Sequence, residues 1–350
     1  ENTETERIKP DSKDLKLAMT IVRTTQMPVA FLKHVPFQPI FDGRKEDQII
    51  AYTFDKYLES GDEEWPLLLP MTKAAVRAMD TIHAFAAKEW QLNVSKFVVA
   101  GASKRGWTTW LTGVADRRVT AIAPMVIDVL NMGSQMKRQR EVYGDYSEQI
   151  GDYTSLKIQD RMDTEEGRKL LSIVDPYAYR DRLTMPKLIL LGTNDPYWTV
   201  DALNLYFDGL QGEKYVLYIP NVGHGLNDMV RLISSVSAFS LKAAGKIEFP
   251  RPSWEFEKGD DAIRLRVRSD VQPESVTIWK ATSDSRDFRK SRWMPQPIEA
   301  SDGTYVYALE RPEKGYAAAF AELRYTIGQT PLYLSTTMRV IESTAAGGKP

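Results

Sequence analysis

Buried strands that alternate with amphipathic helices constrain the fold of this 350-residue chain more than any other feature. A strand that is apolar along its whole length must be covered on both faces, which is typical of a parallel sheet between two layers of helices. We assign five such strands, to residues 27–32, 96–101, 120–127, 187–191 and 214–219. Apolar residues at helical spacing predict helices over 12–22, 72–90 and 228–242, and another from about residue 104, with Ser12 and Thr72 as N-caps.

The pattern changes after residue 250, where short strands are separated by Gly, Pro and Asp. Apolar and charged residues alternate from Ala262 to Arg268, as in an antiparallel strand with one buried face. We therefore predict an α/β domain over residues 1–248 and a small β-sandwich over 249–350. Residues 129–186 are polar with helical patches, and we interpret them as an insertion that covers the sheet like a lid.

Composition excludes several classes of protein. Lys and Arg number 46 against 47 Asp and Glu, and a net charge of −1 excludes nucleic-acid binding by overall charge. No cysteine is present, so disulfides, thiolate metal sites and cysteine nucleophiles are excluded. No apolar run is long enough for a membrane span. We find no zinc-protease, P-loop or dinucleotide-binding motif, and we expect neither a metal nor a cofactor.

The segment from Gly101 to Gly106 lies between a predicted buried strand and a helix, with Ser103 at the turn. A serine on such a sharp turn presents its hydroxyl above the sheet as a nucleophile, in the pattern G-x-S-x-G. The match is incomplete, because Arg105 holds the last glycine position and Gly106 follows one residue later. An N-capping serine on an ordinary helix is the alternative.

Two further residues supply the partners that a serine nucleophile needs, in the chain order serine, acid, histidine. Asp195 follows the strand at 187–191, and His224 follows the strand at 214–219 in a glycine-containing loop. Because parallel strands end at one edge of the sheet, we expect both to lie near Ser103. Histidine can take the hydroxyl proton near neutral pH, and a buried carboxylate can orient the imidazole.

Other residues compete for these roles. Asp128 ends the strand at 120–127 and is the alternative acid, whereas Asp201 is interpreted as a helix cap. His34 and His83 are interpreted as structural, His34 near a sheet edge and His83 as a partly buried residue.

The residues around the predicted nucleophile suggest how a substrate binds. The backbone N–H of Lys104 follows Ser103 at a helix start and is a candidate oxyanion donor. Lys104 and Arg105 would suit an acidic substrate, or they form a solvated first helical turn with acidic partners. Trp198 is the best aromatic candidate for lining a pocket.

Residues 101–110 (GASKRGWTTW), 123–132 (APMVIDVLNM) and 190–198 (LLGTNDPYW) resemble the PhoPQ-activated pathogenicity-related protein family. The resemblance implies an α/β-hydrolase with an added C-terminal β domain, usually exported from bacteria, connected with virulence and related to the autocrine proliferation repressor proteins. Such hydrolases carry about three strands before the helix at 12–22, and the loop after the third donates the second oxyanion N–H. We expect that region to be missing here.

Together these features predict a serine hydrolase that cleaves a peptide, amide or small ester bond, in which Ser103, His224 and Asp195 form the catalytic triad. One alternative is a non-catalytic secreted effector that keeps the hydrolase fold and binds a protein partner through its C-terminal domain. Another is an esterase acting on carbohydrate esters, suggested by Lys104. The resemblance places the protein outside the cell or in the periplasm.

Overall fold

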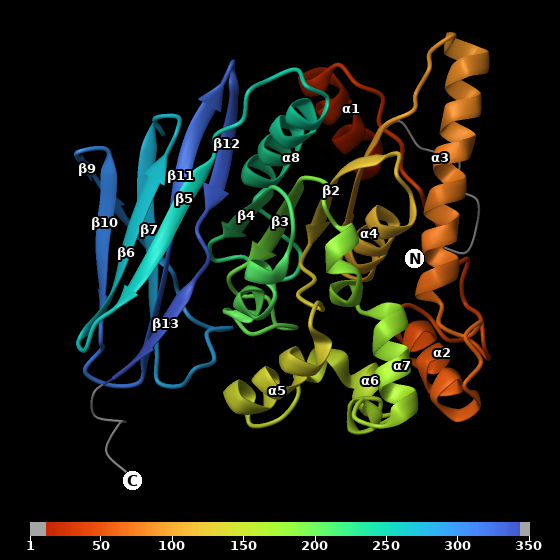
Figure 1. Cartoon of the computed structure of the whole chain (residues 1–350), viewed down its shortest axis with the longest axis horizontal. Coiled ribbons are helices and arrows are strands. Elements are labelled where there is room, and N and C mark those ends of the chain that lie inside the picture. The colour runs from red at the N-terminus through yellow and green to blue at the C-terminus, as the bar shows by residue number, and fades with distance from the viewer. Residues whose placement is uncertain (1–11, 344–350) are drawn as a thin grey trace.

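The computed structural model describes residues 12–343, in which one large sheet extends through both halves of the chain (Figure 1). Its strand order is β1-β2-β3-β4-β12-β11-β7-β8, and β13 pairs with β11. The first four strands are parallel, and they are β1 (Phe97–Ala102), β2 (Val119–Met125), β3 (Lys187–Gly192) and β4 (Lys214–Ile219). The others pair antiparallel, and they are β7 (Ser275–Ser283), β8 (Met294–Ile298), β11 (Tyr316–Ile327), β12 (Thr330–Ser335) and β13 (Arg339–Glu342).

Helices cover both faces of the parallel strands, which confirms the predicted α/β-hydrolase class. In β3, Ile189 and Leu191 join one apolar core while Leu188 and Leu190 join another, so consecutive side chains are buried on opposite faces. One face carries α4 (Lys104–Ala115) and α3 (Leu68–Trp90), and the other carries α8 (Met229–Ala243) and α1 (Lys13–Thr25).

Two local predictions about the N-terminal part were wrong. Residues 27–32 form no strand, and Phe31 and Leu32 are exposed there. The run is apolar enough for a strand, but no neighbouring strand pairs with it in the described chain. Helix α3 starts at Leu68, and the Thr72 hydroxyl donates to the Leu68 carbonyl instead of capping the helix. The cap at Ser12 is confirmed, because its Oγ accepts from the Leu15 N–H at 3.2 Å.

The predicted insertion forms a helical layer below the carboxyl ends of the parallel strands in Figure 1. Helix α2 (Asp47–Ser60), from an earlier part of the chain, packs against α6 and α7 of this layer. The layer contains α5 (Met132–Tyr143), η1 (Glu148–Ile150), α6 (Gly151–Thr154), η2 (Gln159–Arg161), α7 (Glu165–Val174) and η3 (Pro176–Arg182). Two more short turns, η4 (Ala202–Leu205) and η5 (Phe207–Gly209), connect β3 with β4.

The C-terminal part contains a second, antiparallel sheet that packs on the large one. Its order is β5 (Pro252–Lys258), β6 (Ala262–Ser269), β10 (Thr304–Glu310) and β9 (Ala300–Ser301). Leu265 and Val267 from this sheet share a core with Ile278 and Leu323 from the large sheet. The large sheet continues past the predicted domain boundary, because β12 pairs with β4 at Ser335 and Val216.

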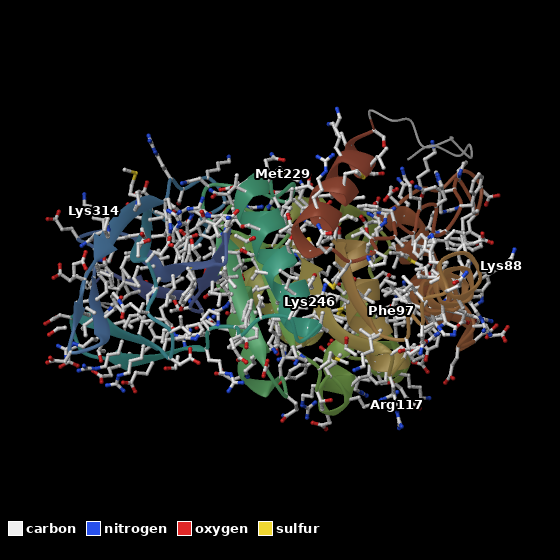
Figure 2. The ribbon with its side chains drawn as sticks, turned by 90° about the horizontal axis from the view of Figure 1, so that it is seen from above. Lys88, Phe97, Arg117, Met229, Lys246 and Lys314 are labelled. Carbon is white, nitrogen blue, oxygen red and sulfur yellow. The ribbon has the colours of Figure 1, made fainter. Side chains whose placement is uncertain are left out.

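Seen from above, the β-rich part and the helical part lie end to end along the long axis (Figure 2). Lys314 marks the β-rich end and Lys88 marks the helical end. The parallel strands lie between these ends, so the loops at their carboxyl edge have helical insertion on one side and β strands on the other.

Candidate active site

Ser103 occupies a strained turn between β1 and α4. Its backbone angles are φ 56° and ψ −131°, a region that non-glycine residues rarely adopt and that is typical of functional turns. Its N–H donates to the Met125 carbonyl at 2.9 Å, which fixes the turn against the end of β2. The side chain makes no capping bond to α4, so this serine is not the ordinary N-cap that was the alternative.

The glycines on either side of the turn allow strand and helix to approach each other. A Cβ on Gly101 would lie 2.6 Å from the Arg105 carbonyl oxygen, and one on Gly106 would lie 2.9 Å from the Gly101 carbonyl oxygen. Side chains at either position would force the turn apart. Gly106 therefore provides the space that the usual pattern provides one residue earlier.

His224 and Asp195 form a hydrogen-bonded pair at the ends of β4 and β3. The Nδ1 of His224 lies 2.8 Å from Oδ2 of Asp195, and the other carboxylate oxygen accepts from the Tyr197 N–H at 2.9 Å. A carboxylate oxygen accepts here, so Nδ1 is the donor of this pair, and in the neutral imidazole Nε2 then carries the lone pair. Nε2 is buried and has no partner among the described residues, while the Tyr197 ring stacks on the imidazole at 4.1 Å.

A single cavity connects the serine with the histidine. Ser103 and His224 both line it, and Asp195 lies behind the imidazole on the side away from the cavity. Trp198 also lines it, as predicted for a pocket aromatic, and its side chain is buried. The structure thus places His224 in contact with Asp195 and places Ser103 in the same cavity lining as His224, without a hydrogen bond between the serine and Nε2. The three residues lie 92 and 29 positions apart in the chain.

The cationic residues after the serine are paired with carboxylates from the start of α2. Lys104 Nζ lies 2.8 Å from Glu46 Oε2 and 3.1 Å from Asp47 Oδ2, and Arg105 also contacts Glu46 Oε2 at 2.9 Å. Burial opposes ionisation of Glu46, but hydrogen bonds from Arg105 and Lys104 outweigh it and lower its pKa to about 2. Burial likewise works against the charge on Lys104, but Asp47 and Glu46 raise its pKa overall. The Lys104 backbone N–H, in contrast, begins α4, where the helix offers it no acceptor.

The alternative acid has a different partner. Asp128 is buried, and its Oδ1 accepts from the Tyr206 hydroxyl at 2.6 Å. Burial raises its pKa to about 7. Since the carboxylate that contacts His224 belongs to Asp195, the geometry favours Asp195 as the orienting acid.

The remaining candidates lie outside the cavity lining. Asp201 precedes η4 without a capping bond and pairs with Arg138 and Arg286, so its interpretation as a cap was wrong. His83 is exposed rather than partly buried, with Nδ1 2.9 Å from the Val94 carbonyl. His34 packs near the Phe37 ring, and Arg105 is likewise absent from the lining.

The loop between β7 and β8 contacts the two loops that carry Asp195 (the acid loop) and His224 (the histidine loop). This contact was not predicted from the sequence. Asn194, next to Asp195, donates to the Arg289 and Ser291 carbonyls at 3.1 and 2.7 Å. Asn221 donates to the Trp293 carbonyl at 2.9 Å and accepts from its N–H at 2.7 Å. The signal in the sequence was an asparagine directly before Asp195 and another three residues before His224, but nothing there indicates the distant partner.

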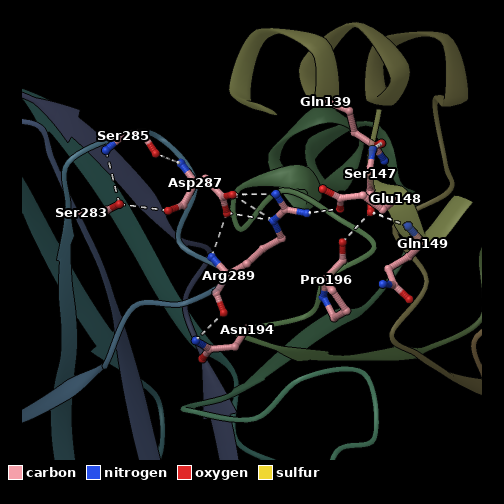
Figure 3. A network of polar contacts seen from close by, with 10 residues as sticks. All are labelled: Gln139, Ser147, Glu148, Gln149, Asn194, Pro196, Ser283, Ser285, Asp287 and Arg289. Carbon is pink, nitrogen blue, oxygen red and sulfur yellow. Dashed lines mark hydrogen bonds and ion pairs between the residues drawn. The ribbon is translucent and has the colours of Figure 1, made fainter. Parts of the chain in front are cut away.

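The same loop also reaches the helical insertion (Figure 3). The Arg289 guanidinium forms a bidentate pair with Asp287 and lies 3.0 Å from Glu148 at the start of η1. Ser147 beside it donates to the Pro196 carbonyl at 2.7 Å, directly after the acid. The β7–β8 loop, the acid loop and the insertion therefore form one continuous polar network.

Two searches over the described residues were negative. No helix in residues 12–343 has both the length and the apolar character that a membrane crossing requires. Within the same range, no group of three or more His, Asp or Glu side chains is arranged to hold a metal ion.

The strained serine turn, the histidine–carboxylate pair and the helix-covered sheet define the α/β-hydrolase fold class. The sequence model of the PhoPQ-activated pathogenicity-related protein family matches residues 1–289, and the chain belongs to this family. It is also 33% identical to autocrine proliferation repressor protein A of Dictyostelium discoideum, over 96% of this chain and 74% of that protein.

Two solved structures are each similar to about half of the chain. Acetyl xylan esterase 1 from Thermoanaerobacterium matches 55% of this chain and 57% of its own length, with a TM-score of 0.38 and 16% identity. A puromycin-hydrolysing peptidase of Mycobacterium tuberculosis matches 50% of this chain but only 26% of its own length, with a TM-score of 0.36 and 17% identity.

Proposed function

We propose that this protein is a serine hydrolase that cleaves a peptide, amide or ester bond. The observation that carries the proposal is the strained Ser103 turn in the same cavity as an imidazole whose Nε2 has no partner and whose Nδ1 contacts Asp195. A structural serine and histidine would need neither the strained backbone nor the unpartnered nitrogen.

In the proposed reaction, the Ser103 hydroxyl attacks the substrate carbonyl while His224 Nε2 takes its proton. Asp195 stabilises the imidazolium that forms, and the Lys104 N–H donates to the developing oxyanion. The imidazolium then gives its proton to the leaving amine or alcohol, and the carbonyl–leaving group bond breaks. Water, deprotonated by His224, hydrolyses the acyl–Ser103 ester and returns the hydroxyl.

A fluorophosphonate probe tests this proposal, because it reacts with an activated serine and needs no knowledge of the substrate. We expect stoichiometric labelling, with the modified peptide containing Ser103 by mass spectrometry. Ser103→Ala should abolish labelling, and Ser155→Ala, at an exposed serine of the insertion, should leave it unchanged. A folded protein that resists the probe would overturn the proposal.

A second function, that of an exported effector without catalysis, is favoured by the name of the relative, an autocrine proliferation repressor. Such a protein would act outside the cell or in the periplasm through a partner bound by residues 249–350. Folded Ser103→Ala separates the two functions. If this variant retains the biological effect measured for the wild-type protein, the effector function is favoured. If it loses that effect together with probe labelling, the hydrolase function is favoured.

A further inference from the structure

We propose that the cavity beside Ser103 is a specificity pocket for an uncharged, apolar substituent on the scissile group, such as an aromatic or branched side chain or an acyl chain. The proposal rests on the hydrolase function proposed above. It adds the class of substrate, which neither the family nor the triad determines.

Apolar side chains from several separate parts of the chain form the walls of this pocket. The empty volume, including the open mouth, is about 690 Å³. Helix α4 and the segment after β2 form one wall, the insertion contributes most of the others, and Phe54 of α2 and Trp198 after β3 also line the cavity. Representative lining residues are Trp107, Ile127, Met132, Met162, Leu170 and Val174.

The charged groups that line the pocket already have partners. Lys104 contacts Asp47, and the other oxygen of this carboxylate accepts from the Tyr153 hydroxyl at 3.1 Å. A charged substituent would lose its hydration on entering and would find no unpaired counter-charge there, which is strongly unfavourable. The pocket therefore selects against acidic and basic substituents, including the acidic substrate suggested by Lys104 and Arg105.

Besides Nε2 of His224, two polar atoms in the lining lack partners among the described residues. They are the Trp198 indole N–H and the Gln159 side-chain carbonyl oxygen. They provide one donor and one acceptor, which suits a neutral polar atom on an otherwise apolar group. This limits the class to apolar substituents that carry at most a hydroxyl, amide or ether.

The pocket is adaptable in shape but fixed in place. Met132, Met136 and Met162 line it, and methionine side chains adjust to differently shaped ligands. The Trp107 indole N–H donates to the Val174 carbonyl at 2.6 Å, which holds the end of α7 against α4. We therefore expect several apolar groups to be accepted, with a limit on length set by the α7 wall.

A series of alkyl fluorophosphonates, from methyl to octyl, tests the pocket and the nucleophile separately. We expect the second-order labelling rate of Ser103 to rise by up to about fourfold per methylene until the pocket is full. A terminal carboxylate or ammonium on the octyl chain should remove the gain. Equal rates across the series, or an unchanged rate with the charged octyl chain, would contradict the proposed pocket but not the proposed hydrolase function. No labelling by any member would overturn the hydrolase itself.

Variants of the α7 wall identify the pocket. Val174→Phe should lower the octyl-to-methyl rate ratio towards one, whereas Val230→Phe, on an exposed position of α8, should leave both rates unchanged. If Val174→Phe fails to fold, Leu170→Ala replaces it and should raise the rate with chains longer than octyl. An unchanged chain-length profile in a folded variant would overturn the assignment.

Ester substrates then assign the substituent to one side of the bond. p-Nitrophenyl esters with acyl chains from acetate to octanoate vary the acyl side, and acetate esters of alcohols of increasing size vary the leaving group. The arm whose kcat/KM rises with apolar size contains the group that enters the pocket. A flat profile in both arms would contradict the proposal.

Discussion

The two sides of the candidate active site are held in place by different means. On the nucleophile side, backbone geometry positions Ser103, through an unusual φ and glycines at 101 and 106. On the histidine side, the side chains of Asn194 and Asn221 form hydrogen bonds with the backbone of the β7–β8 loop, and these bonds hold the loops that carry Asp195 and His224. The first arrangement is local in sequence, whereas the second joins residues 70 to 100 positions apart.

This difference predicts how substitutions on each side should affect stability and reactivity. A strained turn packed against neighbouring backbone tolerates no added atoms, so changes there should disturb folding together with reactivity. A loop held by side-chain hydrogen bonds can lose one and relax, so changes there should lower reactivity more than stability. Variants on the two sides can therefore test this difference.

The largest effect is expected from the carboxylate that contacts His224. Asp195→Asn keeps the shape but weakens the preference for the Nδ1–H tautomer, and should slow fluorophosphonate labelling by about 10⁴-fold. Asp128→Asn, which alters the carboxylate after the neighbouring strand, should cost far less because that group contacts Tyr206. If the two losses were reversed, Asp128 would be the orienting acid.

The second prediction separates the same two carboxylates by pH. Burial raises the pKa of Asp128 to about 7 from an unfolded value near 4, so between these values the folded protein keeps a proton that the unfolded chain has released. The free energy of unfolding should therefore fall as pH rises from 4 to 7. Asp128→Asn should remove a fall on the order of 4 kcal/mol, measured by urea denaturation at pH 4.5 and pH 8.

An equal pH dependence in wild type and Asp128→Asn would contradict the raised pKa. Tyr206→Phe provides the complementary measurement, because it removes the hydrogen bond that favours the charged carboxylate. Without this bond the pKa of folded Asp128 should rise further, so the fall in the free energy of unfolding should become larger and extend to higher pH. Both measurements concern stability, so they are independent of any substrate.

The third prediction concerns the turn itself. In Gly101→Ala the added Cβ would lie 2.6 Å from the Arg105 carbonyl oxygen, which should destabilise the fold by about 1–3 kcal/mol and slow labelling of Ser103. Gly133→Ala is the matched control, because nothing lies within 4 Å of its Cβ in helix α5. This control should be neutral or slightly stabilising. Equal unfolding curves for both variants would show that the turn is not tightly packed.

The nucleophile side could largely be predicted from sequence because its determinants are adjacent in the chain. The apolar strand, the small residues at 101 and 102 and the following helix lie within about 20 positions, so periodicity and motif spacing describe them. The α/β class could be predicted for the same reason, since each buried strand is a continuous apolar run in the sequence. The strand at 27–32 was predicted wrongly because a strand also needs a neighbour, which composition does not provide.

The histidine side could be predicted only in part. Chain order placed Asp195 and His224 at the ends of successive strands, where the structure brings them together. Their supports could not be predicted, because Asn194 and Asn221 contact backbone groups of residues 289–293, whose sequence is that of an ordinary loop. The continuation of the large sheet across residue 249 was equally hidden, since antiparallel strands read alike in a separate sandwich.

The smallest effect is expected at Asn221, where the comparison is most direct. Asn221 lies three residues before His224 and has φ 59°. Its side-chain amide forms two hydrogen bonds with the backbone of Trp293. Asn221→Gly keeps the backbone conformation and removes both bonds, each contributing about 0.5–1.5 kcal/mol. We expect labelling of Ser103 to slow by roughly 10-fold, because a looser loop presents the imidazole to the hydroxyl less often.

Asp302→Gly is the matched control, because Asp302 has a similar φ of 50° in an exposed turn far along the chain. It should leave labelling unchanged. In Asn221→Gly the loss in rate should exceed the loss in stability at pH 7, since the β7–β8 loop also contacts the protein through Asn194 and Glu148. If the labelling rate changed only in proportion to global stability, substitutions on both sides of the site would act in the same way. That result would contradict the distinction between a turn positioned by its backbone and a loop positioned by side-chain hydrogen bonds.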